Sequence, residues 1–268
     1  MTILRRFVVD RWRADAWWGL GIIAMIIVNM AFFPGIKGQA DLDKTIADLP
    51  PALKSMFGIE SGISIGTAAG YIQAQVFSAL MPILLLVLAI GVGSGAVGGS
   101  EEDGTLEFLL AQPVSRRRFL VFRGIGVMVV IVLHTILLTV AMFVICPLFG
   151  ALEGLDLGGL VVACVGCGAL AMLHAMIAFT VGAWLGRRTP AIAIASAVAA
   201  AGYIAVGLFS AIGAPEGLRF ISPWYWFLRE NLMVTGVDWI AFVPALVLSA
   251  VVGAIALPLF LPRDIRGH

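Results

Sequence analysis

The chain has 268 residues, of which 61% are hydrophobic and 12% are charged, and its formal net charge is +1. A soluble domain carries about twice that charged share, so this chain has too little polar surface to cover itself in water. The composition therefore excludes a water-soluble domain and predicts a membrane protein.

Residues 1–15 have the pattern of an amphipathic helix. Arginines fall on one face and apolar side chains on the other, namely Ile3, Leu4, Phe7, Val8 and Trp12. This pattern is typical of a helix that lies in the membrane interface. We expect an interfacial helix over 1–15, followed by a transmembrane domain over 16–268.

Six apolar runs are long enough to cross the hydrocarbon core, which takes roughly 20 helical residues. They lie at 16–34, 71–97, 124–149, 158–185, 190–212 and 239–261. Only a polar turn at 186–189 separates the fourth run from the fifth. Because helices satisfy their own backbone hydrogen bonds in lipid, the runs predict an all-α membrane protein with six transmembrane helices.

The arginines gather before the first run, between the second and third, between the fourth and fifth, and after the sixth. In a six-helix topology these four places lie on one side of the membrane. The other side holds the three lysines, Lys37, Lys44 and Lys54, and many acidic residues. Because basic residues near span ends stay in the cytoplasm, we expect a multi-pass protein of the cell (inner) membrane with both termini cytoplasmic.

Two segments on the predicted outer side have a pattern of their own. In 35–70, apolar residues before and after Pro50 and Pro51 predict two short amphipathic helices broken at the prolines. In 221–227, four aromatic residues gather just before the last run. That cluster is typical of an aromatic belt at the membrane interface, and we favour such a membrane anchor over the alternative, a role in substrate gating.

The apolar runs contain no Asp, Glu, Lys or Arg between their ends, whereas ion-coupled transporters usually need a titratable group inside the membrane. The chain also lacks the GxxxxGK[ST] loop that cradles ATP phosphates. We therefore expect no catalytic residue, metal or cofactor in this chain, and no nucleic-acid partner. Energy for uphill transport has to come from a separate protein.

Two histidines, His134 and His174, lie at similar depths in the third and fourth runs. Each is about ten residues from the inner end of its run, so both sit ~15 Å deep. One interpretation is a polar lining or gate of a transport pathway. We favour the other, a neutral histidine that is hydrogen-bonded inside the bundle.

Small residues recur in two of the runs. Cys164 and Cys167 form a CxxC pair among glycines in the fourth run, where helix packing is a better interpretation than metal or redox chemistry. A ladder of glycines at the inner end of the second run also predicts close helix packing. Its members are Gly91, Gly93, Gly95, Gly98 and Gly99.

The most informative segment is 100–123, between the second and third runs. Its candidate ATPase-coupling residues are Glu101, Glu102, Gly104, Thr105, Leu106, Leu109, Leu110, Pro113, Arg116 and Arg117. Thr105 can cap a short helix over 105–112, and Ser115 can cap the helix that follows. The leucines make one apolar face, which suits docking into a groove of another protein. The alternative is a helix that lies on lipid.

At this segment the chain resembles the ABC-2-type permease family of ABC transporters, which exports drugs, lipids and polysaccharides. Family members carry an acidic cluster, then Gly-Thr-Leu, a pair of leucines, Pro and Ser-Arg. The matching residues here are Glu101-Glu102, Gly104-Thr105-Leu106, Leu109-Leu110, Pro113 and Ser115-Arg116. Ser222-Pro223 before the last run and Arg263-Asp264 after it also agree.

The resemblance implies six spans, an amphipathic N-terminal elbow helix and a cytoplasmic coupling helix over 105–112. It also implies two permeases, as a homodimer or with a paralogue, and ABC ATP-binding subunits that hold ATP and Mg²⁺. The function expected is that of the permease subunit of an ATP-driven exporter, for example in multidrug efflux. Cargo such as drugs, antibiotics or lipids fits spans that offer few polar groups. The alternatives are an ion-driven secondary transporter and a membrane-embedded enzyme scaffold.

Overall fold

A computed structural model describes residues 2–39, 48–57, 63–106 and 115–263. Within these ranges it contains helices and turns but no strand, and six helices are long and apolar enough to cross a membrane. They are Trp12–Ile36, Ala68–Glu102, Arg116–Leu148, Leu157–Leu185, Arg188–Ala211 and Trp239–Phe260. The prediction of an all-α membrane protein with six spans is confirmed.

Four spans are single helices, α2 (Trp12–Ile36), α9 (Arg116–Leu148), α10 (Leu157–Leu185) and α11 (Arg188–Ala211). The second span joins α5 (Ala68–Ile72), the π-helical turn η1 (Gln73–Phe77), α6 (Leu80–Ser94), the π-helical turn η2 (Gly95–Gly99) and α7 (Ser100–Glu102). The sixth joins a 3₁₀ turn, η3 (Trp239–Ala241), to α15 (Val243–Phe260). A π-helical turn inserts one residue, so η2 rotates the side chains of α7 relative to those of α6.

Local capping sets where the spans begin and end. The Ser115 hydroxyl accepts a hydrogen bond from the Arg118 amide at 3.3 Å, which confirms its predicted role as N-cap of α9. Asp156 caps α10 in the same way through the Gly159 amide. Gly186 ends α10 in the left-handed conformation, at φ 65°, and thereby separates the fourth span from the fifth.

The central helix of the bundle is α10, which packs against α6, α9, α11 and α15. In its most apolar stretch 83% of the residues are buried. Small residues allow this, since a Cβ atom at Gly168 would lie 2.1 Å from the Thr135 hydroxyl oxygen. Cys164 and Cys167 are both fully buried on this helix. The helix-packing interpretation of the CxxC pair is confirmed.

The predicted glycine ladder packs at only some of its members. A Cβ atom at Gly93 would lie 2.2 Å from the Ala175 carbonyl oxygen of α10, and one at Gly98 would lie 2.8 Å from the carbonyl carbon of Arg187. Gly91 and Gly95 have no atom that close, so the packing prediction is wrong for these two. Gly91 and Gly93 are two positions apart on the same helix, α6, so they lie on different faces and only Gly93 meets α10.

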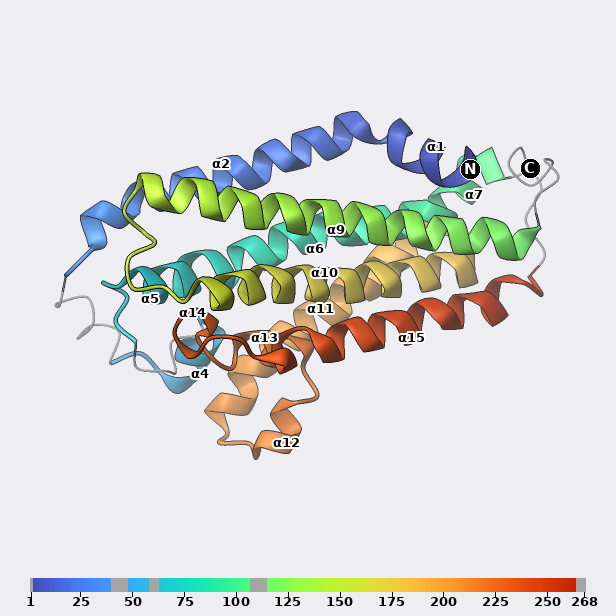
Figure 1. Cartoon of the computed structure of the whole chain (residues 1–268). Coiled ribbons are helices and arrows are strands. Elements are labelled where there is room, and N and C mark those ends of the chain that lie inside the picture. The colour runs from blue at the N-terminus through green and yellow to red at the C-terminus, as the bar shows by residue number, and fades with distance from the viewer. Residues whose placement is uncertain (1, 40–47, 58–62, 107–114, 264–268) are drawn as a thin grey trace.

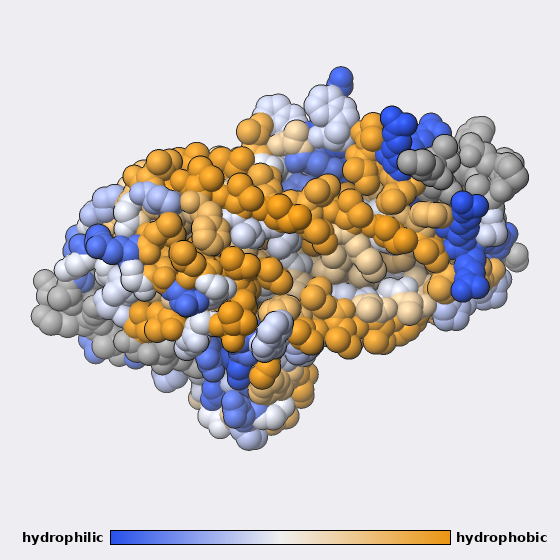
Figure 2. All heavy atoms as spheres, in the orientation of Figure 1, coloured by the Kyte–Doolittle hydropathy of each residue, from blue (hydrophilic) through white to orange (hydrophobic). Residues whose placement is uncertain are grey.

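Figure 1 shows α1 (Thr2–Asp10), α7 and the last turn of α15 at one end of the bundle. We call this the basic end, since it carries Arg116–Arg118, Arg187, Arg188 and Arg263. The opposite half carries the short helices α4 (Pro51–Met56), α12 (Glu216–Arg219), α13 (Pro223–Leu228) and α14 (Leu232–Thr235). Figure 2 shows apolar residues along the shared length of the spans, with hydrophilic ones gathered at the basic end and around α12.

The N-terminal helix α1 is joined to α2 at Arg11, so the helix of the first span begins at Trp12 and not at the predicted residue 16. An ion pair between Arg11 and Asp15, at 3.5 Å, supports helix through these charged residues. Phe7 is buried, and the Arg123 guanidinium of α9 lies 5.0 Å from the centre of its ring. The apolar face of α1 therefore packs on α9.

Two predictions concern the opposite half. The helix α4 begins at Pro51, as expected of the second amphipathic helix in 35–70; most of the first falls at 40–47, outside the described residues. The prediction of an aromatic belt is wrong, because Trp224 and Phe227 are each only 2% exposed. The Trp224 indole donates to the Ala199 carbonyl at 3.0 Å, so its polar group meets backbone and not the membrane interface.

Candidate functional site

The candidate coupling residues fall into two groups. Leu109, Leu110 and Pro113 lie within 107–114, outside the described residues. The others lie at the basic end, where Arg117 is exposed and Gly104 takes the left-handed conformation at φ 68°. The amides that Thr105 would cap also belong to 107–114; the Thr105 hydroxyl itself donates to the Ser100 carbonyl at 3.0 Å.

Leu106 does not face a partner protein. Its side chain is fully buried in the main apolar core of this chain. The expectation that it contributes to an exposed docking face is therefore wrong, because the end of the second span turns it into the bundle. Any docking face of this segment has to be made by other residues.

Glu101 is buried at the basic end and pairs with Arg263, which follows α15. The Glu101 side chain is 5% exposed and the Arg263 side chain 18%, and a guanidinium nitrogen contacts the carboxylate oxygen Oε2. A second guanidinium nitrogen, Nη1, donates to the Trp184 carbonyl of α10 at 3.2 Å. A carboxylate this far from water needs such a partner, since an uncompensated buried charge is strongly unfavourable.

Further contacts extend this pair to two more helices. Glu102 accepts a hydrogen bond from the backbone amide of Arg188, the first residue of α11, at 3.1 Å. A carboxylate is favourable there, because a helix N-terminus presents unpaired amides and partial positive charge. Arg116, the first residue of α9, donates to the Arg263 carbonyl at 2.9 Å.

Glycine is required where these groups meet. A Cβ atom at Gly186 would lie 2.5 Å from Nη1 of Arg263 and 2.5 Å from Oε1 of Glu101. The left-handed conformation of Gly186 also disfavours any residue with a side chain. We call this set the basic-end junction; it comprises Glu101, Glu102, Arg116, Gly186, Arg188 and Arg263.

The basic-end junction connects the ends of several helices. Its acidic residues belong to α7, and their direct partners are Arg188 at the start of α11 and Arg263 after α15. Arg263 in turn bonds to the end of α10 and the start of α9. A displacement of α7 therefore acts directly on α11 and α15, and through Arg263 on α9 and α10. Sequence reasoning placed Glu101, Glu102 and Arg116 in this region but missed Arg188 and Arg263 as their partners, and Gly186 as the residue that leaves space for the ion pair.

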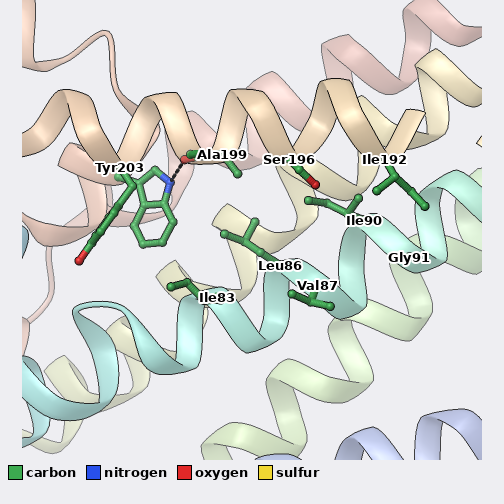
Figure 3. A pocket seen from close by; sticks show the side chains of 11 residues that line it. Ile83, Leu86, Val87, Ile90, Gly91, Ile192, Ser196, Ala199 and Tyr203 are labelled. Carbon is green, nitrogen blue, oxygen red and sulfur yellow. Dashed lines mark hydrogen bonds between the residues drawn. The ribbon is translucent and has the colours of Figure 1, made fainter. Parts of the chain in front are cut away.

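A second candidate site is a cavity of about 450 Å³ between α6 and α11. Figure 3 shows Ile83, Leu86, Val87 and Ile90 of α6 opposite residues of α11. Ser196 and Tyr203 are the members of its lining that carry a hydroxyl group, and the remaining lining is apolar apart from the Trp224 indole. Such a lining fits an apolar or amphipathic ligand.

Trp224 of α13 helps to form one end of this cavity. Its ring lies 4.7 Å from that of Tyr203, centre to centre, and its indole nitrogen is already hydrogen-bonded to the Ala199 carbonyl. Sequence reasoning favours a membrane anchor over a substrate-gating role for this segment, because a Trp beside a predicted span end looks like an interfacial anchor. The preceding Ser222-Pro223, which starts α13, is the signal that could have indicated a turn back into the bundle.

The two histidines are buried, His134 at 5% exposed and His174 at 1%. In each, Nδ1 lies within hydrogen-bond distance of the carbonyl one turn back, 2.9 Å from Val130 for His134 and 2.8 Å from Leu170 for His174. Neither histidine lines the cavity between α6 and α11. These contacts favour the interpretation as hydrogen-bonded residues of the bundle.

Among the described residues, no group of three or more His, Cys, Asp or Glu is placed to hold a metal ion. The fold defines the class of protein: a multi-pass, all-helical membrane protein with an apolar cavity between two spans. A family model described as ABC-2 family transporter protein matches residues 1–265, so the chain belongs to the ABC-2 transporter family. A search of the curated proteins finds no match.

Proposed function

We propose that this chain is the permease subunit of an ATP-driven exporter of hydrophobic or amphipathic cargo. Family membership supports a transport subunit in the membrane. The observation that carries the proposal is the basic-end junction, in which α7 is bonded to the start of α11 and to Arg263 after α15, immediately before the candidate coupling segment. A segment joined in this way can pass movement from a cytoplasmic partner into the spans.

The partner is an ABC ATP-binding subunit that holds ATP and Mg²⁺. The arginine bias supports an orientation in which the basic end faces the cytoplasm, in a protein of the cell (inner) membrane. The apolar residues Leu109 and Leu110 dock on the partner, and charged residues such as Arg117 lie at the rim. Hydrolysis displaces this segment, and Glu101 and Glu102 pass the displacement to α15 and α11.

The cavity between α6 and α11 supports cargo that is mainly apolar. Its lining offers hydroxyl groups at Ser196 and Tyr203 to orient a polar end, and aliphatic side chains elsewhere. A second permease, identical or a paralogue, packs against one of the spans that are least buried within one chain. Only 28% of the most apolar stretch of α2 and 22% of those of α11 and the sixth span are buried.

An ion-driven transporter is the second candidate, and one observation bears on it. His134 and His174 are titratable groups within the spans, yet both are buried and bonded to backbone carbonyls. A coupling ion would need access to such a group. We therefore favour ATP as the source of energy.

The test is copurification of the full chain with its ATP-binding partner from native membranes. We expect the wild-type chain to retain an ATP-hydrolysing polypeptide, and Leu109→Asp to lose it, because an unpaired carboxylate in an apolar contact costs several kcal/mol. Arg117→Gln is the matched control, since an exposed rim charge mainly tunes the rate and salt dependence of association. If Leu109→Asp keeps normal copurification and coupling, this segment is not the docking element.

A further inference from the structure

A separate apolar groove runs between α9 and α15, on the face shown in Figure 1 and Figure 2. Its volume is about 230 Å³, and every residue that lines it is apolar. The walls are Leu120, Gly124 and Met128 of α9, facing Ala250, Ala254 and Leu257 of α15. Buried Met176 and Phe179 of α10 form the floor.

The groove lies along the helix axes. The helices α9 and α15 run in opposite directions beside α10. Leu120 therefore lies at about the same depth in the membrane as Leu257, and Met128 at about the same depth as Ala250. The eight steps along the helix from Leu120 to Met128 span ~12 Å at 1.5 Å per residue. One leaflet of the hydrocarbon core is ~15 Å thick. The groove therefore has the length and direction of an acyl chain in one leaflet.

Positive charge stands at one end of this groove. Arg116 lies one helical turn before Leu120, and its guanidinium reaches across to the Arg263 carbonyl that follows α15, at 2.9 Å. Arg117 and Arg118 are exposed beside it. Phe119 and Phe260 are both buried and stack 6.3 Å apart, centre to centre, which joins the start of α9 to the end of α15.

We propose that this groove binds one acyl chain of an anionic membrane phospholipid, whose phosphate lies against the arginines at the start of α9. The apolar lining accounts for the chain, and the arginines account for the headgroup, since guanidinium groups pair readily with phosphate. The lipid belongs to the leaflet at the basic end. Under the proposed orientation this is the cytoplasmic leaflet, where anionic lipids attract basic residues.

Another transmembrane helix is the competing occupant. A helix is about 10 Å across, so 12 Å of it would displace several times the volume of the groove. Only a narrow chain fits between α9 and α15 without moving them apart. The small residues Gly124, Ala250 and Ala254 could still receive the ridge of a partner helix, so the experiment has to separate the two occupants.

The experiment counts lipids on the purified full chain by native mass spectrometry, with phosphatidylglycerol or phosphatidylcholine as the added probe. Ala250→Phe/Ala254→Phe fills the groove with side chains that start from exposed positions of α15. Val247→Phe/Val251→Phe is the matched control, since it introduces two phenylalanines at the same spacing at positions that are 58% and 51% exposed and lie outside the groove lining.

We expect the wild type and the control to retain one tightly bound phosphatidylglycerol in preference to phosphatidylcholine. The groove-filled variant should bind it about tenfold more weakly, which is the factor expected when two methylene groups lose their burial. Arg117→Gln/Arg118→Gln should lower the preference for phosphatidylglycerol but leave binding of both lipids. Equal lipid retention by the groove-filled variant and the control would overturn the proposal. It would also be overturned if the groove-filled variant lost a copurifying polypeptide and kept its lipid. The measurement needs no ATPase, so its outcome is independent of the proposed transport cycle.

Discussion

Single residues at the basic-end junction hold charges that the surrounding core would otherwise exclude. Glu101 and Arg263 are 162 positions apart in the chain, and each alone looks like an ordinary charge at a span end. Their pairing was not predictable from the sequence, because the pairing depends on how the ends of α7 and α15 are brought together. Because Glu101 is buried, the stability of the protein should be sensitive to the loss of either charge of this pair.

Removing one charge of the pair should destabilise the protein by about 3 kcal/mol, because the remaining charge is left buried and unpaired. We expect Glu101→Gln and Arg263→Gln each to lower the thermal midpoint in detergent and to abolish cargo-stimulated ATP hydrolysis. The charge-swapped double variant Glu101→Arg/Arg263→Glu should recover part of both. Additive losses in the double variant would show that the pair does not act as a unit.

A substitution at Gly186 tests how closely Glu101 and Arg263 approach this position of the basic-end junction. Gly186→Ala places a methyl group 2.5 Å from both partners of the ion pair and also strains the left-handed backbone. Gly213→Ala is its control, because Gly213 has φ 60° but nothing within 4 Å of the added atom. The control should lose about 1 kcal/mol from backbone strain alone. Thermal unfolding should show a clearly larger loss for Gly186→Ala, and equal losses would contradict the close contact.

The buried histidines should be dispensable for transport. Glutamine can donate to the carbonyl one turn back as the imidazole does, but it does not titrate. His134→Gln and His174→Gln should therefore keep transport close to wild type, with an unchanged pH profile. A large loss in both variants at normal membrane abundance would mean that the histidines belong to the transport pathway.

At the scale of elements, the spans were predictable and their ends were not. A run of about 20 apolar residues leaves a helix as the favourable structure in lipid, and all six runs form helices. Charged residues extend several of these helices where they find partners, as Arg11 does with Asp15 at the start of α2. The inward turn of α13 escaped prediction because aromatic residues at a span end suit the interface and the core equally well.

The cavity between α6 and α11 makes a prediction at this scale. Ser196→Phe should fill part of the cavity and lower transport of bulky hydrophobic cargo several-fold, with less effect on small cargo. Val198→Phe is the control, since Val198 is 41% exposed on the same helix and does not line the cavity. Transport assays with a size series of cargo distinguish the two. Equal effects of both variants would place the cargo elsewhere.

At the scale of the whole molecule, four spans pack around α10 and α2 packs on α9, with α1, α7 and the basic-end junction at one end of the bundle. This arrangement puts the candidate coupling segment and the ends of four spans within reach of one partner. The cavity between α6 and α11 lies within the same bundle, so one displacement at the basic end can change its shape. The central claim is that the displacement comes from ATP hydrolysis on another subunit.

The most direct measurement is transport in sealed proteoliposomes that contain the chain and its copurified ATP-binding partner. The account predicts movement of a fluorescent hydrophobic cargo that requires Mg²⁺ and ATP, continues when ionophores abolish ion gradients, and stops in Glu101→Gln while the partner remains bound. Transport that persists without ATP and ceases with the ionophore would contradict the account and identify an ion-driven transporter.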